Sequence, residues 1–150
     1  MELGYVGLGA MGGALARRLM LSHKLRVLDL RPEIITEFAD NGAIPAQDGA
    51  SMARESDIIL LCLPRSADVR DAIFGPGGLA EGLDPGKIII DQTSGNPDET
   101  RAMAAELAEQ GVTMIDAPVS GGPAGADAGT IAIMVGGTVE TFDTVKPYLE

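Results

Sequence analysis

The sequence is poor in aromatic residues, in cysteine and in positive charge. Aromatic residues make up 3% of the 150-residue chain and tryptophan is absent, so we expect an aliphatic core with close alanine and glycine contacts. The single cysteine, Cys62, cannot form an internal disulfide, which favours a cytoplasmic setting and a role as a small buried hydrophobe. The 11 basic and 22 acidic residues give a net charge of -11, which argues against a nucleic-acid or anionic-membrane surface.

Long apolar runs and metal-ligand clusters are also missing. The longest apolar stretch, Ile58 to Leu63, is far too short to cross a bilayer. Met1 leads directly into the first expected strand, so we expect no signal or transit segment. No grouping of histidine, cysteine and aspartate suggests a metal site, and we expect the lone His23 to face solvent beyond the first helix. A chain of this length fits one domain that buries a core without disulfides.

Three glycines mark the first chemically informative stretch. Gly7, Gly9 and Gly12 follow the apolar run Leu3 to Val6 and open a segment with helical periodicity. In such a unit the first glycine allows the tight turn, the second leaves room for a pyrophosphate, and the third lets helix and strand pack closely. The free N–H groups and the dipole of the helix would then face the phosphates. The alternative is a plain structural turn, since glycine turns are common.

A carboxylate at the end of the second expected strand supports a dinucleotide. Asp29 lies 20 residues after Gly9, where a carboxylate can accept both hydroxyl groups of the adenosine ribose and repel a 2′-phosphate. Arg31 complicates this interpretation, because an arginine here can instead hold the 2′-phosphate of NADP. Otherwise Arg31 simply faces solvent before Pro32. The position of the carboxylate favours NAD over NADP.

The rest of the chain alternates short apolar runs with helical segments. This alternation predicts an α/β, Rossmann-like, doubly wound fold with a mainly parallel sheet and helices on both faces. The expected strands span residues 3–6, 25–29, 43–44, 57–62, 87–91, 112–117 and 130–135, and a glycine-rich loop covers 120–129. We expect the last helix to start at Thr138 and to bury Phe142, Val145 and Leu149.

Several strand ends meet at one edge of such a sheet, where ligands bind. Asp91 and Asp116 have no visible perturbing partner, so we interpret them as strand-end caps rather than as catalytic acids. We predict one ligand cleft along this edge. The segments expected there are Gly7 to Gly12, Asp29, Leu63-Pro64, Asp91 to Ser94 and Asp116 to Gly122.

Four segments carry a family resemblance. They are Gly7-Leu8-Gly9-Ala10-Met11-Gly12, Leu63-Pro64, Asp91-Gln92-Thr93-Ser94 and, most specifically, Asp116 to Ala126, which reads DAPVSGGPAGA. In these the chain resembles the β-hydroxyacid dehydrogenases, which include 3-hydroxyisobutyrate dehydrogenase, tartronate semialdehyde reductase and the amino-terminal part of 6-phosphogluconate dehydrogenase. The resemblance covers essentially the whole chain. It implies an oxidoreductase that moves hydride between NAD and a small β-hydroxyacid substrate.

The resemblance also implies roles for individual residues. Ser120, Gly121 and Gly122 would hold the substrate carboxylate, a task that suits a hydroxyl group followed by glycine N–H groups. A flexible turn is the alternative for this segment. The pyrophosphate of the cofactor would contact Gly9, Ala10 and Met11, between Gly7 and Gly12. The adenosine ribose would contact Asp29 and Leu30, beside Arg31. Leu63 and Pro64 would lie along the cofactor, and Thr93 and Ser94 would lie near the nicotinamide ribose.

The chain departs from the family pattern in two ways. Gly95 and Asn96 stand where many relatives carry isoleucine and serine or aspartate, so the details of the substrate mouth stay open. Family members also continue into a helical domain that supplies a catalytic lysine and most of the dimer interface, whereas this sequence stops at Glu150. We therefore expect these residues to bind cofactor but scarcely to turn over, and the full-length protein to be a homo-oligomer. The lysines of the sequence, none expected in the cleft, are Lys24, Lys87 and Lys146.

Two functions from other classes remain open. One is a stand-alone dinucleotide-sensing module without catalysis, which the short length favours. The other is an S-adenosylmethionine methyltransferase, which also uses a glycine turn and an acid after the second strand. That class does not need Gly12, and it would not explain Ser120-Gly121-Gly122.

Overall fold

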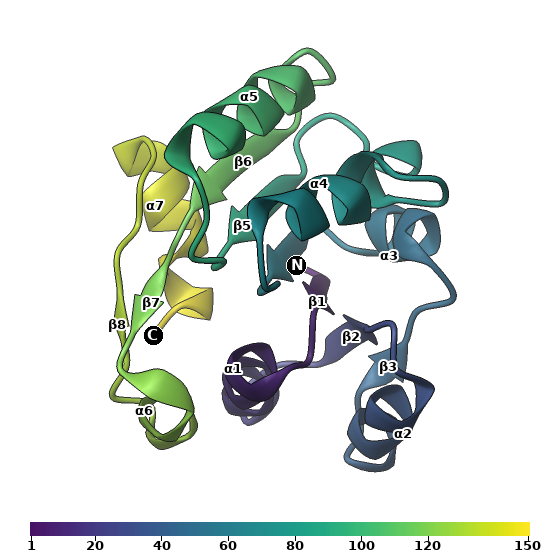
Figure 1. Cartoon of the computed structure of the whole chain (residues 1–150), viewed down its shortest axis with the longest axis vertical. Coiled ribbons are helices and arrows are strands. Elements are labelled where there is room, and N and C mark those ends of the chain that lie inside the picture. Colours follow the sequence, from purple (N-terminus) through teal and green to yellow (C-terminus); the bar gives the residue numbers. More distant parts are fainter.

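The computed structural model describes residues 1–150 and has a six-stranded sheet at its centre (Figure 1). All neighbouring strands are parallel, in the order β3-β2-β1-β4-β5-β6, so the direction of winding reverses between β1 and β4. This order confirms the predicted Rossmann-like fold. The strands are β1 (Leu3–Val6), β2 (Leu25–Leu28), β3 (Ile44–Pro45), β4 (Ile58–Leu61), β5 (Ile88–Asp91) and β6 (Thr113–Asp116), each within one residue of its expected ends.

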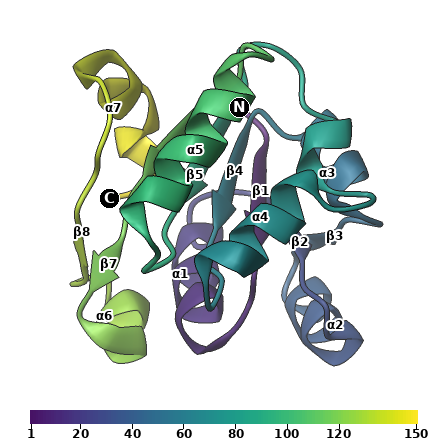
Figure 2. The ribbon, with the colours of Figure 1, turned by 45° about the horizontal axis from the view of Figure 1, so that its top comes forward.

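Helices cover both faces of the sheet. Figure 2 shows α4 and α5 in front of β4 and β5, with α1 behind the sheet. The helices connecting the strands are α1 (Ala10–Met20), α2 (Pro32–Asp40), α3 (Gly49–Glu55), α4 (Ser66–Phe74) and α5 (Pro97–Ala108), with a 3-10 turn at Leu79–Glu81. None of the helices is both long enough and apolar enough to cross a bilayer.

The continuous apolar strands supply two separate cores, because successive side chains of a strand point to opposite faces. Tyr5 and Leu60 belong to the core beneath α1, whereas Val6 and Leu61 belong to the core beneath α4 and α5. The Tyr5 hydroxyl, buried in the first core, donates a hydrogen bond to Gln92 Oε1 at 2.7 Å. This bond satisfies the polar end of the largest buried side chain.

The last part of the chain, residues 117–150, forms a carboxy-terminal unit beside the sheet, at the left of Figure 1. Two expectations are wrong here. The expected loop 120–129 contains helix α6, and the expected strand 130–135 is a two-residue strand, β8, that pairs antiparallel with β7 outside the main sheet. Packing against α1 stabilises α6, whose Ala126 is fully buried. The elements are β7 (Val119–Ser120), α6 (Gly122–Ala128), β8 (Ala132–Ile133), α7 (Val139–Val145) and a 3-10 turn at Lys146–Tyr148.

The burial of the last helix also differs from expectation. Val145 is fully buried and Leu149 packs against the core, but Phe142 is 39% exposed, so the prediction that Phe142 points inward is wrong. The helix changes from α to 3-10 geometry at Lys146. The buried face of this segment therefore contains Val145 and Leu149, and Phe142 lies at the surface.

Candidate functional site

The turn between β1 and α1 contains three glycines with different structural roles. Gly7 has φ +92°, and a Cβ at this position would overlap the carbonyl oxygen of Cys62. A Cβ at Gly12 would overlap the carbonyl oxygen of Gly7, so the missing side chain lets α1 pack on β1. A Cβ at Gly9 would meet no atom within 4 Å. The fold therefore requires Gly7 and Gly12, whereas Gly9 borders open space.

The first turn of α1 presents backbone N–H groups to this space. Gly9 is the N-cap residue, no side chain caps the helix, and no acidic side chain lies in the first turn. The Gly13 N–H donates to the Gly9 carbonyl oxygen at 2.7 Å, which leaves the N–H groups before it without intrahelical acceptors. Together with the helix dipole, these groups form a site that stabilises an anion.

Asp29 lies directly after β2, and its side chain is only 7% exposed. Its Oδ2 accepts the Leu8 N–H at 2.7 Å. Arg31 donates to Oδ1 through its backbone N–H at 3.0 Å and its Nε at 2.9 Å, and to Oδ2 through Nη2 at 3.1 Å. Burial opposes ionisation, but the hydrogen bonds from Arg31 and Leu8 outweigh it and lower the pKa of Asp29. Asp29 is therefore ionised, and Arg31 binds it rather than simply facing solvent.

The glycine turn and Asp29 line one cleft with a volume of about 1010 Å³. Every residue predicted to bind cofactor lines this cleft except Thr93 and Ser94; those that do are Gly7, Gly9, Ala10, Met11, Gly12, Asp29, Leu30, Arg31, Leu63 and Pro64. The sequence interpretation missed one wall. It consists of Gln47, Asp48 and Gly49 after β3, Asp68, Asp71 and Ala72 on α4, and Pro76 to Leu79. The strand order could have identified this wall, since β3 and β4 end beside β2 and β1.

Thr93 and Ser94 follow β5, next to the loop that carries Leu63. Thr93 Oγ1 accepts the Leu63 N–H at 3.1 Å, and the Thr93 N–H donates to Asp91 Oδ1 at 2.9 Å. Asp91 therefore caps the strand end, as the sequence predicts. The expectation that no partner perturbs its pKa is wrong. Burial raises the pKa of Asp91 and the charge of Asp116 raises it further, against hydrogen bonds from Thr93 that lower it.

Cys62 lies under the glycine turn and is half-buried. Burial, with a smaller effect from the charge of Asp91, raises the pKa of the Cys62 thiol to about 11. The thiol is protonated at neutral pH, which agrees with a packing role and not with a nucleophile.

Ser120, Gly121 and Gly122 lie outside this cleft, at the start of α6. Gly121 has φ +139° and Gly122 has φ +70°, so both occupy backbone conformations that favour glycine. Helix α6 runs along α1 on the side away from α2 (Figure 1). The structure therefore does not bring Ser120, Gly121 and Gly122 into the cleft that the glycine turn lines.

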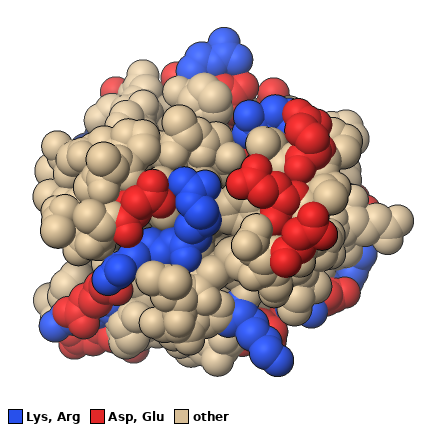
Figure 3. Space-filling view, turned by 90° about the horizontal axis from the view of Figure 1, so that it is seen from below, with Lys and Arg blue, Asp and Glu red and all other residues tan.

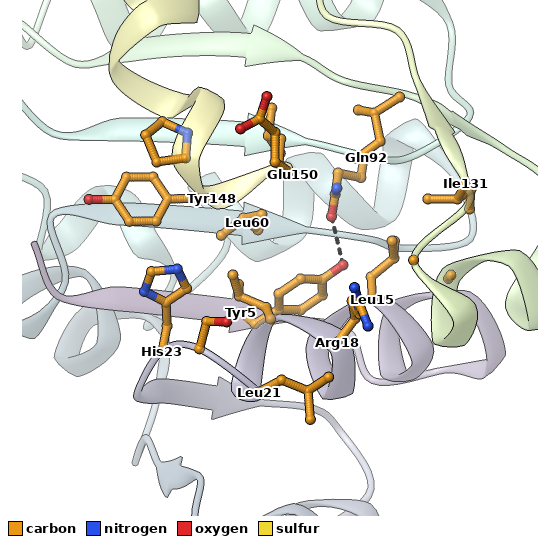
Figure 4. A pocket seen from close by; sticks show the side chains of 17 residues that line it. Tyr5, Leu15, Arg18, Leu21, His23, Leu60, Gln92, Ile131, Tyr148 and Glu150 are labelled. Carbon is orange, nitrogen blue, oxygen red and sulfur yellow. Dashed lines mark hydrogen bonds between the residues drawn. The ribbon is translucent and has the colours of Figure 1, made fainter.

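A smaller pocket of about 340 Å³ lies on the other side of α1 (Figure 4). Tyr5 and Gln92 form part of its lining, and none of the glycine-turn residues contributes to it. The rings of His23 and Tyr148, which also line this pocket, lie in a tilted arrangement with 5.3 Å between their centroids and 57° between their planes. His23 is half-buried, so the expectation that it faces solvent is wrong.

No lysine or histidine lines the larger cleft. Lys87 Nζ donates to the carbonyl oxygens of Ala53 and Arg54, and Lys146 pairs with Glu150 at 3.4 Å. Figure 3 shows acidic and basic side chains side by side on the face seen from below, where neither sign covers the surface. The cleft thus offers backbone N–H groups and aspartate carboxylates, and neither a lysine nor a histidine lines it.

Comparisons with known proteins agree with this geometry. Residues 2–150 match the family model described as the NAD binding domain of 6-phosphogluconate dehydrogenase. The "Probable 3-hydroxyisobutyrate dehydrogenase, mitochondrial" of Dictyostelium discoideum is 38% identical over 99% of this chain and 46% of that protein. The 2-hydroxy-3-oxopropionate reductase of Escherichia coli K12 is 38% identical over 100% of this chain and 51% of that protein. A solved structure described as Psf3 in complex with NADP+ and 2-OPP is 32% identical, with a TM-score of 0.92 over 98% of this chain and 52% of that one.

The match extends along the whole of this chain but not along the whole of its relatives. The chain spans about half the length of the curated relatives it matches. The matched residues of this chain include the strand order, the glycine turn and the strand-end carboxylate described above. The relatives include proteins named as a 3-hydroxyisobutyrate dehydrogenase and a 2-hydroxy-3-oxopropionate reductase. The chain belongs to the family of the 6-phosphogluconate dehydrogenase NAD-binding domain.

Proposed function

We propose that residues 1–150 bind NAD in an oxidoreductase that moves hydride between the nicotinamide and a small β-hydroxyacid of the 3-hydroxyisobutyrate type. The observation that carries the proposal is the uncapped first turn of α1, which opens into a cleft that ionised Asp29 also lines. The names of the relatives support the choice of substrate class.

The residues of the cleft fit the parts of a dinucleotide. The open space at Gly9 and the free N–H groups of α1 suit a pyrophosphate, and Asp29 suits the adenosine ribose. Leu30 is fully exposed at the cleft, so its side chain offers an apolar surface for the adenine ring. A volume of about 1010 Å³ is sufficient for a ligand of this size.

Cofactor choice depends on Asp29 and Arg31. The Asp29 carboxylate repels a 2′-phosphate, which supports NAD over NADP. Four hydrogen bonds already occupy its oxygens, so Arg31 has to release at least part of its contact before ribose hydroxyls bind. The released guanidinium would be free to meet a 2′-phosphate, which reduces the preference for NAD.

When bound, NAD supplies the hydride acceptor, and the protein binds and orients it. Ser120, Gly121 and Gly122 would hold the substrate carboxylate through a hydroxyl group and backbone N–H groups. Because no lysine or histidine lines the cleft, we propose that the base that takes the hydroxyl proton is a lysine outside residues 1–150. By the family resemblance, this lysine belongs to a helical domain that also forms a homo-oligomer interface. The single, half-buried thiol of Cys62 is compatible with a cytoplasmic location.

Titration calorimetry of the 150-residue chain with NAD and with NADP tests the cofactor proposal. We expect both to bind, NAD more tightly, and no reduction of NAD when 3-hydroxyisobutyrate is added. Failure of both dinucleotides to bind would overturn the proposal. Turnover by the chain itself would show that the base lies within these residues. A stand-alone dinucleotide-binding module is the second candidate, favoured by the same cleft without a proton acceptor; a longer protein that also lacks turnover would support it.

A further inference from the structure

Two hydrogen bonds connect the loop after β4 to the loop after β5. Thr93 Oγ1 accepts the Leu63 N–H at 3.1 Å, and Ser66 Oγ accepts the Asn96 N–H at 2.8 Å. Ser66 is the first residue of α4 and is 8% exposed, and Asn96 is the N-cap residue of α5. One buried hydroxyl group therefore joins the starts of two helices.

Ser94 and Gly95 lie between these two connections. Neither residue makes a hydrogen bond of its own, whereas Thr93 and Asn96 on either side are both held. Ser94 is exposed. Its position relative to Leu63 thus depends on the bond at Thr93 and on the bond at Asn96.

Gly95 is coupled to Ser66 by close approach. A Cβ at position 95 would lie 2.5 Å from Ser66 Oγ but 3.7 Å from Ser66 Cβ, so only the hydroxyl group is in its way. A side chain at position 95 would therefore push the hydroxyl away from the Asn96 N–H. Glycine suits this position because it leaves the Ser66 hydroxyl group in place to accept the Asn96 N–H.

The strand order indicates which half of a dinucleotide would meet these loops. Asp29 follows β2 and the glycine turn follows β1, whereas β4 and β5 lie on the other side of β1. A dinucleotide crosses the sheet edge at the point where the strand order reverses. With adenosine at Asp29, its other half extends over the ends of β4 and β5, beside Leu63 and Ser94.

We infer that Ser66 is a positioning residue that holds Ser94 in place for the nicotinamide ribose through the Asn96 N–H. The inference rests on the proposed NAD function. Without this bond the Ser94–Gly95 span gains conformational freedom, which binding then has to remove. The loss of one such hydrogen bond predicts about a three- to tenfold weaker affinity for NAD. The adenosine and pyrophosphate contacts lie elsewhere, so they should not change.

The test compares NAD with ADP, which has the adenosine and both phosphates but no nicotinamide riboside. Calorimetric titrations use the 150-residue chain and the variants Ser66→Ala, Ser66→Thr and Gly95→Ala. We expect Ser66→Ala and Gly95→Ala each to weaken NAD binding about three- to tenfold and to leave ADP binding unchanged. Ser66→Thr keeps a hydroxyl group and should retain NAD affinity. Adding Gly95→Ala to Ser66→Ala should cause no further loss, because the hydroxyl group is already gone.

Three other results would contradict the inference or the function on which it rests. An equal loss of NAD and ADP affinity in Ser66→Ala would mean that Ser66 supports the whole site, and unchanged NAD affinity would mean that Ser94 needs no positioning. Either result overturns the inference alone. A wild-type chain that binds neither ligand overturns the proposed function, and the inference with it. Circular dichroism on every variant checks folding, and Gly95→Ala gives the same test if Ser66→Ala does not fold.

Discussion

The six-stranded sheet and the carboxy-terminal unit hold their proposed ligand-binding segments in different ways. The glycine turn leaves a strand that is paired on both sides, and the Gly7 N–H donates to the Leu28 carbonyl oxygen at 2.9 Å. The Ser120-Gly121-Gly122 segment leaves β7, which pairs with β8 over only two residues. The cofactor turn is therefore fixed by the central sheet, whereas the proposed carboxylate segment depends on a short hairpin and on α6.

This difference indicates where the site is rigid. An isolated two-stranded pair is marginal in water, so β7 and β8 need the contact of α6 with α1. Arg17 and Asp127 bridge these helices at 3.2 Å, but both side chains are about half exposed. Buried Ala126, not this ion pair, is the main anchor of α6. We expect the cofactor site to tolerate changes that loosen the carboxy-terminal unit.

The largest effect is expected at Gly12, where the sheet fixes the turn. The substitution Gly12→Val places a side chain against the backbone carbonyl of Gly7, which cannot move without breaking the β1–α1 packing. We expect a loss of about 4 kcal/mol or more in the free energy of unfolding. Urea denaturation followed by circular dichroism measures it. A variant of unchanged stability would show that α1 is free to shift.

Gly9→Val is the matched variant in the same turn. Its side chain enters open space, so we expect the unfolding midpoint to stay close to that of the wild type. The clash would be with bound pyrophosphate, and overpacking of up to about 3 kcal/mol corresponds to roughly a hundredfold weaker NAD binding. Loss of fold in this variant would mean that Gly9 has a structural role.

A smaller effect is expected at Asp29, which lines the same cleft. Replacing Asp29 by serine removes the charge that repels a 2′-phosphate and frees Arg31. We expect the ratio of NADP to NAD affinity to rise about tenfold, which corresponds to one charged hydrogen bond. Arg31→Ala is the control and should lower this ratio. Calorimetry with both dinucleotides measures the change, and an unaltered ratio in both variants would place cofactor selection elsewhere.

A pH-dependent effect is expected at Asp91, the last residue of β5. Since burial and the charge of Asp116 raise the pKa of folded Asp91, the folded state binds the proton more tightly than the unfolded state. Stability from this group is present below the unfolded pKa of about 4 and is lost as pH rises through the folded pKa. We expect Asp91→Asn, which can still accept the Thr93 N–H, to gain stability relative to wild type as pH rises from 4 to 7. A constant difference in unfolding free energy would show that the pKa of Asp91 is not raised.

The smallest effect is expected at the ion pair between α1 and α6. Asp127→Ala should cost less than about 1 kcal/mol, because both partners are exposed. NAD affinity should not change. Denaturation and calorimetry on the same variant check both expectations. A large loss of NAD affinity would mean that α6 controls the cofactor turn, which would remove the distinction between the two regions.

The sequence predicts the sheet better than it predicts the carboxy-terminal unit, for a physical reason. Two kinds of signal in the sequence are local. A buried strand such as Ile58 to Leu61 requires apolar residues at every position, and the positive φ of Gly7 requires glycine. Helix α6 has the sequence GPAGADA, which lacks helical periodicity. It forms where small residues can approach α1, and that approach depends on contacts distant in the chain.

The same limit applies within the site. The glycine turn, Asp29 and Leu63-Pro64 could be assigned to one cleft from strand ends alone. The hydrogen bonds from Arg31 to Asp29 and from Asn96 to Ser66 could not be predicted from the sequence, because each depends on one side-chain conformation. The raised pKa of Asp91 likewise follows from burial in three dimensions.

The open surroundings of Gly9 have an evolutionary consequence. Folding restrains Gly7 and Gly12, but within the chain nothing lies close enough to restrain a side chain at position 9. In a lineage that lost its dinucleotide, position 9 would therefore be the first of the three glycines to drift, while the other two persisted. Comparing these three positions across related genes would separate proteins that still bind the nucleotide from proteins that have kept only its fold.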